Sequence, residues 1–212
     1  KAAAGGGGRG LKVIRAESEA KGLIESAQRE SQSAFGSSKV FLEKYMDHAK
    51  HIEIQIFGDA AGQVFHLGER ECSIQRRHQK IVEEAPSAML DDHLRDEIFA
   101  VAVKLAEKAR YQGAGTVEFL VQDGSFYFME MNTRLQVEHS VSELVMGVDL
   151  VKAQLITAQG ISLHWSQSNF QARGTAIECR IYAEDPFKGG IPSVGVLGSN
   201  HWPQGPGRRF EI

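Results

Sequence analysis

The chain has 212 residues, of which 42% are hydrophobic, so it is long and apolar enough to form one or two domains with a buried core. A formal net charge of -3 argues against a nucleic-acid or anionic-membrane surface, and two distant cysteines, Cys72 and Cys179, argue against a disulfide framework or a zinc site and favour a reducing compartment. The sequence also lacks an apolar run of about 18 residues that could cross a bilayer.

Glycines dominate the beginning of the chain, where four in a row follow Lys1 and three alanines. Because glycine has no side chain, the backbone amides of such a run can close around an anion, but the same composition is typical of flexible linkers. No Gly-Lys-Ser/Thr follows, so the run is not a P-loop. From the missing initiator Met and the abrupt, strand-like end at residues 208–212, we expect an internal piece of a longer polypeptide.

The next elements are a helix, a strand and a hairpin. Residues 17–35 are rich in helix formers with apolar residues three to four apart, which predicts a short surface helix. Residues 39–46 predict a strand that runs into a connection. Residues 51–57 alternate isoleucine with polar side chains, and after a turn at residues 58–62 the chain returns through residues 63–67, which predicts a hairpin.

Two core helices are expected in the rest of the chain. Apolar residues mark one face of residues 91–110, and Asp91 or Asp92 is placed to cap this helix. A second apolar set between residues 144 and 155 predicts another helix, closed by Gly160.

Three further strands complete the pattern. Residues 116–121 and 126–132 flank a turn around Asp123 and Gly124, and residues 175–182 form a later strand. Together these elements predict an α+β fold with antiparallel strands. A loose boundary near Asp47 separates a small lid from a larger body of sheet and helices.

Polar side chains occupy every second position after the second hairpin. They are Glu130, Asn132, Arg134, Gln136 and Glu138. An extended segment would place all of them on one side. Such alternation is common on solvated strand faces, but carboxylates, amides and a guanidinium are ligands for metals and anions.

Glu118 lies in the partner strand of this segment. It shares a face with Glu130 if the intervening loop has an odd number of residues, and a two-residue loop puts the two on opposite faces. On one face, two carboxylates and the carbonyl oxygen of Asn132 make a hard site for Mg²⁺ or Mn²⁺ bridging nucleotide phosphates. Their mutual repulsion without a cation supports a metal.

Two other features have ordinary explanations. The basic cluster at residues 75–80 fits a charged loop better than a nucleic-acid patch, because the chain is acidic and no aromatics are interleaved. Arg180 shares a predicted strand face with Glu178 and Tyr182, for which an ion pair is the default interpretation.

In this order, the segments resemble the biotin carboxylase family of ATP-grasp enzymes over nearly the whole chain. The resemblance is carried by residues 1–10, 43–46, 51–55, 68–80, 113–118, 129–139 and 178–180. It implies an α+β ATP-grasp fold, with a Gly-rich lid and an antiparallel sheet flanked by helices, truncated at both ends. Residues 1–46 then belong to the lid subdomain, and residues 47–212 to the catalytic body and the start of the C-terminal region.

The resemblance also implies roles for single residues. Those implied to contact ATP are Lys1, Gly7, Gly8, Glu43, Lys44, Tyr45, Met46, His51, Gln75 and His78. Glu118, Glu130 and Asn132 are implied to hold Mg²⁺ or Mn²⁺ at the nucleotide. The implied bicarbonate and biotin groups are Lys80, Arg134, Gln136, the backbone of Val137, Glu138 as general base and Arg180 as stabiliser of the biotin oxyanion.

The function implied is ATP- and bicarbonate-dependent carboxylation of biotin through carboxyphosphate, the first half-reaction of a biotin-dependent carboxylase. Biotin arrives on a carrier protein or domain, since no Met-Lys-Met biotinylation motif is present. A carboxyltransferase, a homo-oligomeric state and a bacterial cytoplasm or mitochondrial matrix are further expectations. The alternatives are another ATP-grasp ligase, such as a carbamoyl-phosphate synthetase, and a non-catalytic ATP-binding fragment; residues 134–139 and 178–180 argue against the former.

Overall fold

The computed structural model describes residues 1–4, 10–76, 78–196 and 198–211. These residues form two compact units, residues 1–179 and 180–212. Within the described ranges, no helix combines the length and the apolar character needed to cross a membrane.

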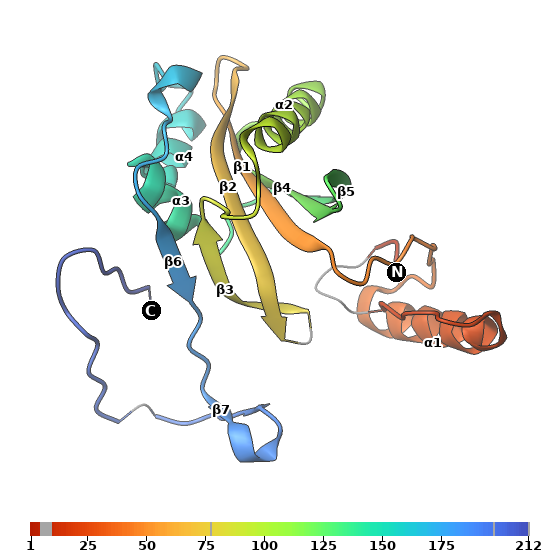
Figure 1. Cartoon of the computed structure of the whole chain (residues 1–212). Helices are drawn as coiled ribbons and strands as arrows, with labels where there is room; N and C mark the ends of the chain where they lie inside the picture. The colour runs from red at the N-terminus through yellow and green to blue at the C-terminus, as the bar shows by residue number, and fades with distance from the viewer. Residues whose placement is uncertain (5–9, 77, 197, 212) are drawn as a thin grey trace. The chain divides into compact units, whose positions relative to one another are not determined.

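A six-stranded antiparallel sheet forms the centre of the first unit, with strand order β5-β4-β1-β2-β3-β6 (Figure 1). The strands are β1 (Lys50–Gly58), β2 (Val64–Arg76), β3 (Gln79–Ala85), β4 (Gly113–Gln122), β5 (Ser125–Asn132) and β6 (Ala176–Cys179). The predicted hairpins at residues 51–67 and 116–132 are therefore confirmed, and the pairing of β1 with β4 brings them together.

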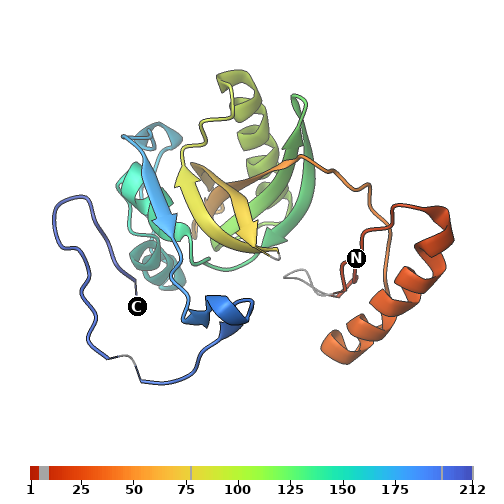
Figure 2. The same cartoon turned by 60° about the horizontal axis from the view of Figure 1, so that its bottom comes forward.

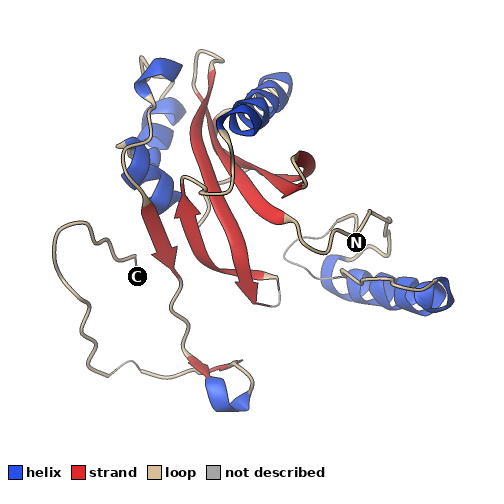
Figure 3. Cartoon of the chain, in the orientation of Figure 1, coloured by secondary structure: helices blue, strands red, loops and turns tan. Residues whose placement is uncertain are grey.

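Helices cover both faces of this sheet (Figures 2 and 3). Helix α2 (Asp92–Lys108) packs on one face, where Ile52, Ile54 and Ile56 of β1 meet Ile98 in the larger apolar core. Helices α3 (His139–Met146) and α4 (Leu150–Ala158) cover the other face, and Leu150 lies there in a second core cluster. Burying such side chains is worth about 1.5–3 kcal/mol each, so the two clusters hold the layers together.

The predicted cap of α2 is confirmed, and the prediction of one helix after it is wrong. Asp91 accepts a hydrogen bond from Leu94 N at 2.8 Å and begins α2. The second apolar set forms two helices, because Gly147 adopts a left-handed conformation with φ of 69° and ends α3. Asp149 then begins α4 by accepting from Lys152 N at 2.7 Å.

The N-terminal segment contains the predicted helix but not the predicted strand. Helix α1 (Glu17–Phe35) has the predicted bounds and ends at Gly36, whose φ is 68°. Residues 39–46 are not a strand, because Val40 makes one isolated bridge, to Ala2, and the other described residues of the segment have no neighbouring strand to pair with.

The C-terminal region has little regular structure. A short helix η1 (Gln167–Asn169) precedes β6, and the second unit contains β7 (Glu184–Asp185), η2 (Pro186–Lys188) and β8 (Ile191–Pro192). Strand β6 ends at Cys179, so the strand predicted over residues 175–182 is shorter than expected. Arg180 therefore follows the strand and belongs to the second unit, which means that it does not share a strand face with Glu178.

Candidate functional site

The turn between β4 and β5 has two residues. Gln122 pairs with Ser125, which leaves Asp123 and Gly124 as the loop. Both loop residues have positive φ, 52° and 69°, as expected of the tight turn that an Asp-Gly pair favours. By itself, a loop of this length would put the two carboxylates of the predicted metal site on opposite faces of the hairpin.

A β-bulge reverses that outcome. Phe119 pairs with Phe128, but the next pair along the hairpin is Glu118 with Glu130, so Met129 is the extra residue. Because one inserted residue moves every following side chain to the other face, Glu118 and Glu130 lie opposite each other on the same face. The common face, one of the two arrangements that the sequence left open, is therefore observed, through a bulge and not through an odd-numbered loop.

The three predicted metal ligands come together on this face. Asn132 Nδ2 lies 2.8 Å from Glu118 Oε1 and 3.4 Å from Glu130 Oε1. Glu118 is buried, with 3% of its surface exposed, and the other two are partly buried. The Asn132 amide turns its nitrogen to the carboxylates here; with its oxygen turned to an ion, the three groups would form an oxygen donor set that suits Mg²⁺.

The predicted extended alternation beyond β5 is wrong. Strand β5 ends at Asn132, residues 133–137 form a bend and a turn, and Glu138 is the N-cap of α3. Gln136 and Glu138 are nevertheless buried beside the sheet because the turn folds back over it. Arg134 is exposed and donates to the carbonyl oxygen of Leu135 at 3.2 Å, so it does not join the buried groups.

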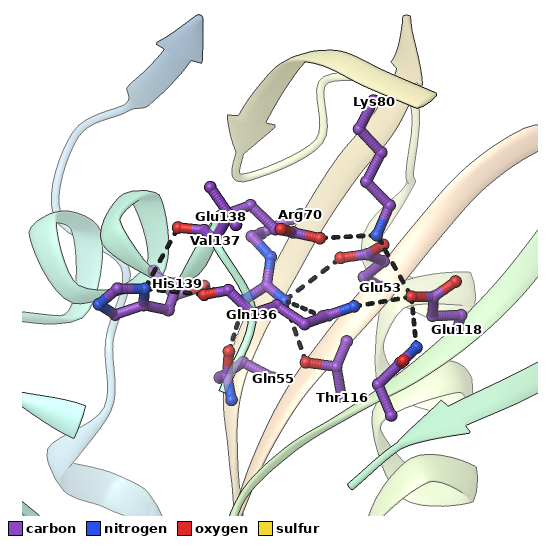
Figure 4. A network of polar contacts seen from close by, with 12 residues as sticks. Glu53, Gln55, Arg70, Lys80, Thr116, Glu118, Gln136, Val137, Glu138 and His139 are labelled. Atoms are coloured by element: carbon purple, nitrogen blue, oxygen red, sulfur yellow. Dashed lines mark hydrogen bonds and ion pairs between the residues drawn. The ribbon is translucent and has the colours of Figure 1, made fainter. Parts of the chain in front are cut away.

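A fully buried guanidinium lies at the centre of this polar face (Figure 4). Arg70 on β2 is 0% exposed and donates to acceptors from several elements. The acceptors are Gln55 at 2.6 Å, Ser142 at 2.9 Å, Thr116 at 3.1 Å, Glu53 at 3.2 Å and Gln136 at 3.2 Å. Burial alone would lower the pKa of Arg70, but the Glu53 carboxylate raises it, so the guanidinium is charged.

Lys80 on β3 supplies a second cation to the same face (Figure 4). Its ammonium lies 2.6 Å from Glu138 Oε1 and 3.2 Å from Glu118 Oε1, and it also pairs with Glu53. Burial opposes the charged ammonium, but the three carboxylates, with Glu53 first, raise the pKa of Lys80 above its ordinary value. Lys80 therefore carries its charge at neutral pH.

Of the three carboxylates that contact Lys80, Glu138 and Glu118 stay ionised, whereas burial raises the pKa of Glu53. Burial alone would raise the pKa of Glu138, but Lys80 and Arg70 hold it at about 2. Burial also opposes ionisation of Glu118, yet the hydrogen bond from His51 and the charge of Lys80 hold the pKa of Glu118 well below its usual range. At neutral pH the face therefore presents ammonium, guanidinium and carboxylate groups in contact.

His51 and Gln75, both predicted at the nucleotide site, extend this network. Gln75 Nε2 lies 2.7 Å from His51 Nδ1 and 2.8 Å from the carbonyl oxygen of Cys72. With the Gln75 amide as donor, His51 Nδ1 is the acceptor and its Nε2–H donates to Glu118 at 2.9 Å. The two residues thus hold the oxygen of Glu118 that Asn132 does not contact.

Comparison with known proteins identifies the family. Residues 1–166 match the family described as carbamoyl-phosphate synthase L chain, ATP binding domain. The chain belongs to this family. Its fold is therefore that of an ATP-grasp domain, which confirms the fold class expected from the sequence.

Several relatives are about half identical to the chain. A biotin carboxylase of Nostoc sp. is 51% identical over 212 residues, which cover 100% of this chain and 47% of the relative. A biotin carboxylase of Pseudomonas aeruginosa is 50% identical over 214 residues, which again cover 100% of this chain and 47% of the relative. The chain thus spans less than half the length of these curated relatives.

A solved structure is similarly close. The biotin carboxylase domain dimer of Hydrogenobacter thermophilus 2-oxoglutarate carboxylase was crystallised with MgADP, ADP and bicarbonate. It is 50% identical to this ATP-binding domain with a TM-score of 0.93, over 97% of this chain and 46% of that one. The resemblance to biotin carboxylases is therefore confirmed.

Other residues predicted to contact ATP form a separate group. Lys1 Nζ lies 3.6 Å from Glu43 Oε2. Lys44, Tyr45 and Met46 line a cavity of about 320 Å³ together with Tyr127 and the tip of the β4–β5 hairpin. Gly7 and Gly8 lie outside the described residues.

Two other predicted residues are exposed. His78 lies in the turn between β2 and β3 with φ of 64°. Val137 is 59% exposed, and its carbonyl oxygen lies 3.2 Å from His139 Nδ1. Neither contributes a side chain to the buried network described above.

Sequence reasoning missed several members of the buried network. Glu53 and Gln55 alternate with isoleucines in a segment that was interpreted as part of a hairpin, and Arg70 and Thr116 received no role. The sequence could have indicated Glu53 and Gln55, because the isoleucines of this strand all lie on one face and the polar residues between them must lie on the other. No comparable signal exists for Arg70, since its partners come from distant parts of the chain.

Proposed function

We propose that the intact protein carrying this chain is a biotin carboxylase. It uses ATP and bicarbonate to carboxylate biotin on a carrier protein, as the first half-reaction of a biotin-dependent carboxylase. The observation that supports this best is the contact of Lys80 with both Glu138 and Glu118, which joins an anion-binding group, a base and a cation site within one network. A relative with 50% identity was solved with MgADP and bicarbonate, which supports the same assignment.

Glu118, Glu130 and Asn132 hold Mg²⁺ in this proposal. Their oxygen-rich donor set and the direct pairing of the two glutamates fit this ion. The ion bridges the nucleotide phosphates and neutralises charge that develops during phosphoryl transfer. His51 and Gln75 orient Glu118, while Lys1 with the glycine-rich segment and residues 43–46 bind the rest of the nucleotide.

Bicarbonate lies between Lys80 and Gln136, with Arg134 and the backbone of Val137 completing the site. Cationic and amide donors fix a small planar anion for attack on the γ-phosphate. Glu138 accepts the bicarbonate proton as an oxygen of bicarbonate bonds to the γ-phosphorus and ADP leaves, which forms carboxyphosphate. When Lys80 turns from Glu138 to the substrate, the basicity of Glu138 rises, because that ammonium is the largest of the groups that lower its pKa.

Carboxyphosphate then gives CO₂ and phosphate. Phosphate takes the proton of the biotin ureido nitrogen, and Arg180 stabilises the resulting oxyanion before the nitrogen bonds to CO₂. The biotin carrier and a carboxyltransferase are the partners, and the dimer of the Hydrogenobacter relative supports a homo-oligomer. Residues 1–46 form part of the lid subdomain, and residues 47–212 form the body.

The test is phosphate release by the intact protein with Mg-ATP, with and without bicarbonate and free biotin. We expect release that requires bicarbonate and rises with biotin. Release that requires bicarbonate and ignores biotin would favour a carbamoyl-phosphate synthase-like ligase, which the description of the family also covers. Release indifferent to both compounds would contradict the proposal.

A further inference from the structure

Arg70 differs from the residues assigned above because it is buried away from any substrate. No part of its surface is exposed, and its five side-chain acceptors come from β1, β4, the turn after β5 and helix α3. A buried charge is costly unless it is paired and hydrogen-bonded, and an apolar core of the same volume is often as stable. Stability alone is therefore a weak explanation for a guanidinium at this position.

Two of the acceptors lead directly to the groups that bind bicarbonate. The amide oxygen of Gln136 accepts a hydrogen bond from Arg70 at 3.2 Å, and its amide nitrogen donates to Glu118 at 2.9 Å. The contact to Arg70 therefore determines which end of the Gln136 amide faces the cation site and which faces the buried arginine.

Glu53 provides the second route. One of its oxygens accepts from Arg70 at 3.2 Å, and the other pairs with Lys80, whose ammonium contacts Glu138 at 2.6 Å. Without Arg70, Glu53 would keep Lys80 as its cationic partner and could hold it more tightly against the sheet. The position of Lys80 thus depends on Arg70 through one bridging carboxylate (Figure 4).

We infer that Arg70 is a positioning residue for bicarbonate, because its Nη2 both orients the Gln136 amide and shares the Glu53 carboxylate with Lys80. This inference rests on the proposed function. Lysine cannot replace arginine here, since Nη1 holds Gln55 and Ser142 while Nη2 reaches Glu53 and Gln136, and a single ammonium lacks this planar fork.

Arg95 provides a matched comparison. It lies on α2 and donates to Glu69 at 2.9 Å and to the backbone oxygens of Ser87 and Leu90, so it also pairs with a buried glutamate. These partners differ from the acceptors that connect Arg70 to Lys80 and to the Gln136 amide. Replacing Arg95 therefore tests the loss of a structural arginine alone.

The experiment compares wild type, Arg70→Lys, Thr116→Val and Arg95→Lys in the intact protein. Thr116→Val removes one acceptor of Arg70 while keeping nearly the same volume, so it serves if Arg70→Lys does not fold. For each variant, the KM for bicarbonate, the KM for Mg-ATP, kcat and Tm are measured in the phosphate-release assay well below Tm.

We expect Arg70→Lys to reduce kcat/KM for bicarbonate by about tenfold or more, because small misplacements of reacting groups have effects of up to roughly a hundredfold. The KM for Mg-ATP should stay within about twofold, and Thr116→Val should show the same pattern more weakly. Arg95→Lys should lower Tm and leave both KM values unchanged.

The outcomes separate the inference from the proposed function. Wild type without bicarbonate-dependent release overturns the proposed function, and this inference with it. If wild type is active and Arg70→Lys only lowers Tm, as expected of Arg95→Lys, without changing the KM for bicarbonate, the inference is overturned and the proposed function is not. If Arg70→Lys does not fold, Thr116→Val decides: an unchanged KM for bicarbonate with a lowered Tm rejects the positioning role.

Discussion

The two faces of β1 are buried to the same extent, but one carries apolar side chains and the other carries polar ones. Ile52, Ile54 and Ile56 point to α2 and Glu53 and Gln55 to the other face, and all five are 0% exposed. The apolar face needs only shape and volume, so it tolerates substitutions that conserve them. The polar face must pair its charges, because an unpaired charge in a buried site costs several kcal/mol, although Nε of Arg70 has no hydrogen-bond partner among the described residues.

One face of β1 therefore contributes to the stability of the fold, and the other to the chemistry of the candidate site. Substitutions on the α2 face should change how much protein is folded and leave the activity of each folded molecule intact. Substitutions on the polar face should change substrate binding and turnover, because Lys80 contacts both Glu118 and Glu138 there. The predictions below test this division, from the largest expected effect to the smallest.

Glu138→Gln should have the largest effect. Loss of a general base reduces turnover by about 10²–10⁴-fold, so bicarbonate-dependent phosphate release should fall by that factor while Mg-ATP affinity is retained. Steady-state kinetics and nucleotide titration measure the two quantities. Glu97→Gln, on the exposed side of α2, is the control and should change neither.

Ile98→Ala should instead destabilise the packing of the apolar face. Ile98 is fully buried between α2 and the sheet, so its truncation should lower the free energy of unfolding by about 2–5 kcal/mol. Urea denaturation measures this loss. Val101→Ala, at a 39% exposed position of the same helix, should cost less than about 1 kcal/mol. A large fall in kcat per folded molecule of Ile98→Ala would contradict the division.

Glu130→Gln should weaken Mg-ATP binding by about tenfold, because it replaces one of two carboxylates proposed for the metal with a neutral amide. Its affinity for ATP without Mg²⁺ should change little. Titration of the nucleotide at several Mg²⁺ concentrations separates the two affinities. Equal losses of Mg-ATP affinity in Glu130→Gln and Glu138→Gln would reject the separate roles of these residues.

The last expected difference concerns how the stability of the fold changes with pH. The pKa of Glu138 is lowered to about 2 from an ordinary value near 4.5, so its ionised form stabilises the fold above pH 4.5. That contribution is lost as the pH falls from about 4.5 through 2. Glu138→Gln should therefore show a smaller decrease in Tm over this range than wild type, and parallel curves would contradict the assigned contacts.

Some elements could be predicted from local patterns alone. Helix α1 has the predicted bounds, α2 begins at the predicted cap Asp91, and β1 follows its period-two alternation. The wrong predictions concern places where a local pattern had no matching neighbour. Residues 39–46 have strand-like composition but, among the described residues, pair only through the isolated bridge of Val40 to Ala2, and Gly147 interrupts an apolar pattern that otherwise suits one helix.

The candidate site shows the same division. Its metal-type residues could be named in advance, but the common face of Glu118 and Glu130 depends on the bulge at Met129, which no alternation pattern reveals. The approach of Gln136 and Glu138 depends on the turn before α3 and not on the extended strand that their spacing suggested.

The sequence by itself determined the α+β class, the apolar face of β1 and the resemblance that named most of the site, because these depend on residue types and short-range spacing. Only the tertiary structure decided that Arg70 lies among Glu53, Thr116 and Gln136, 17, 46 and 66 residues away along the chain. A buried charge is stable only where the complete fold brings its partners together, and local sequence contains no record of those distant contacts.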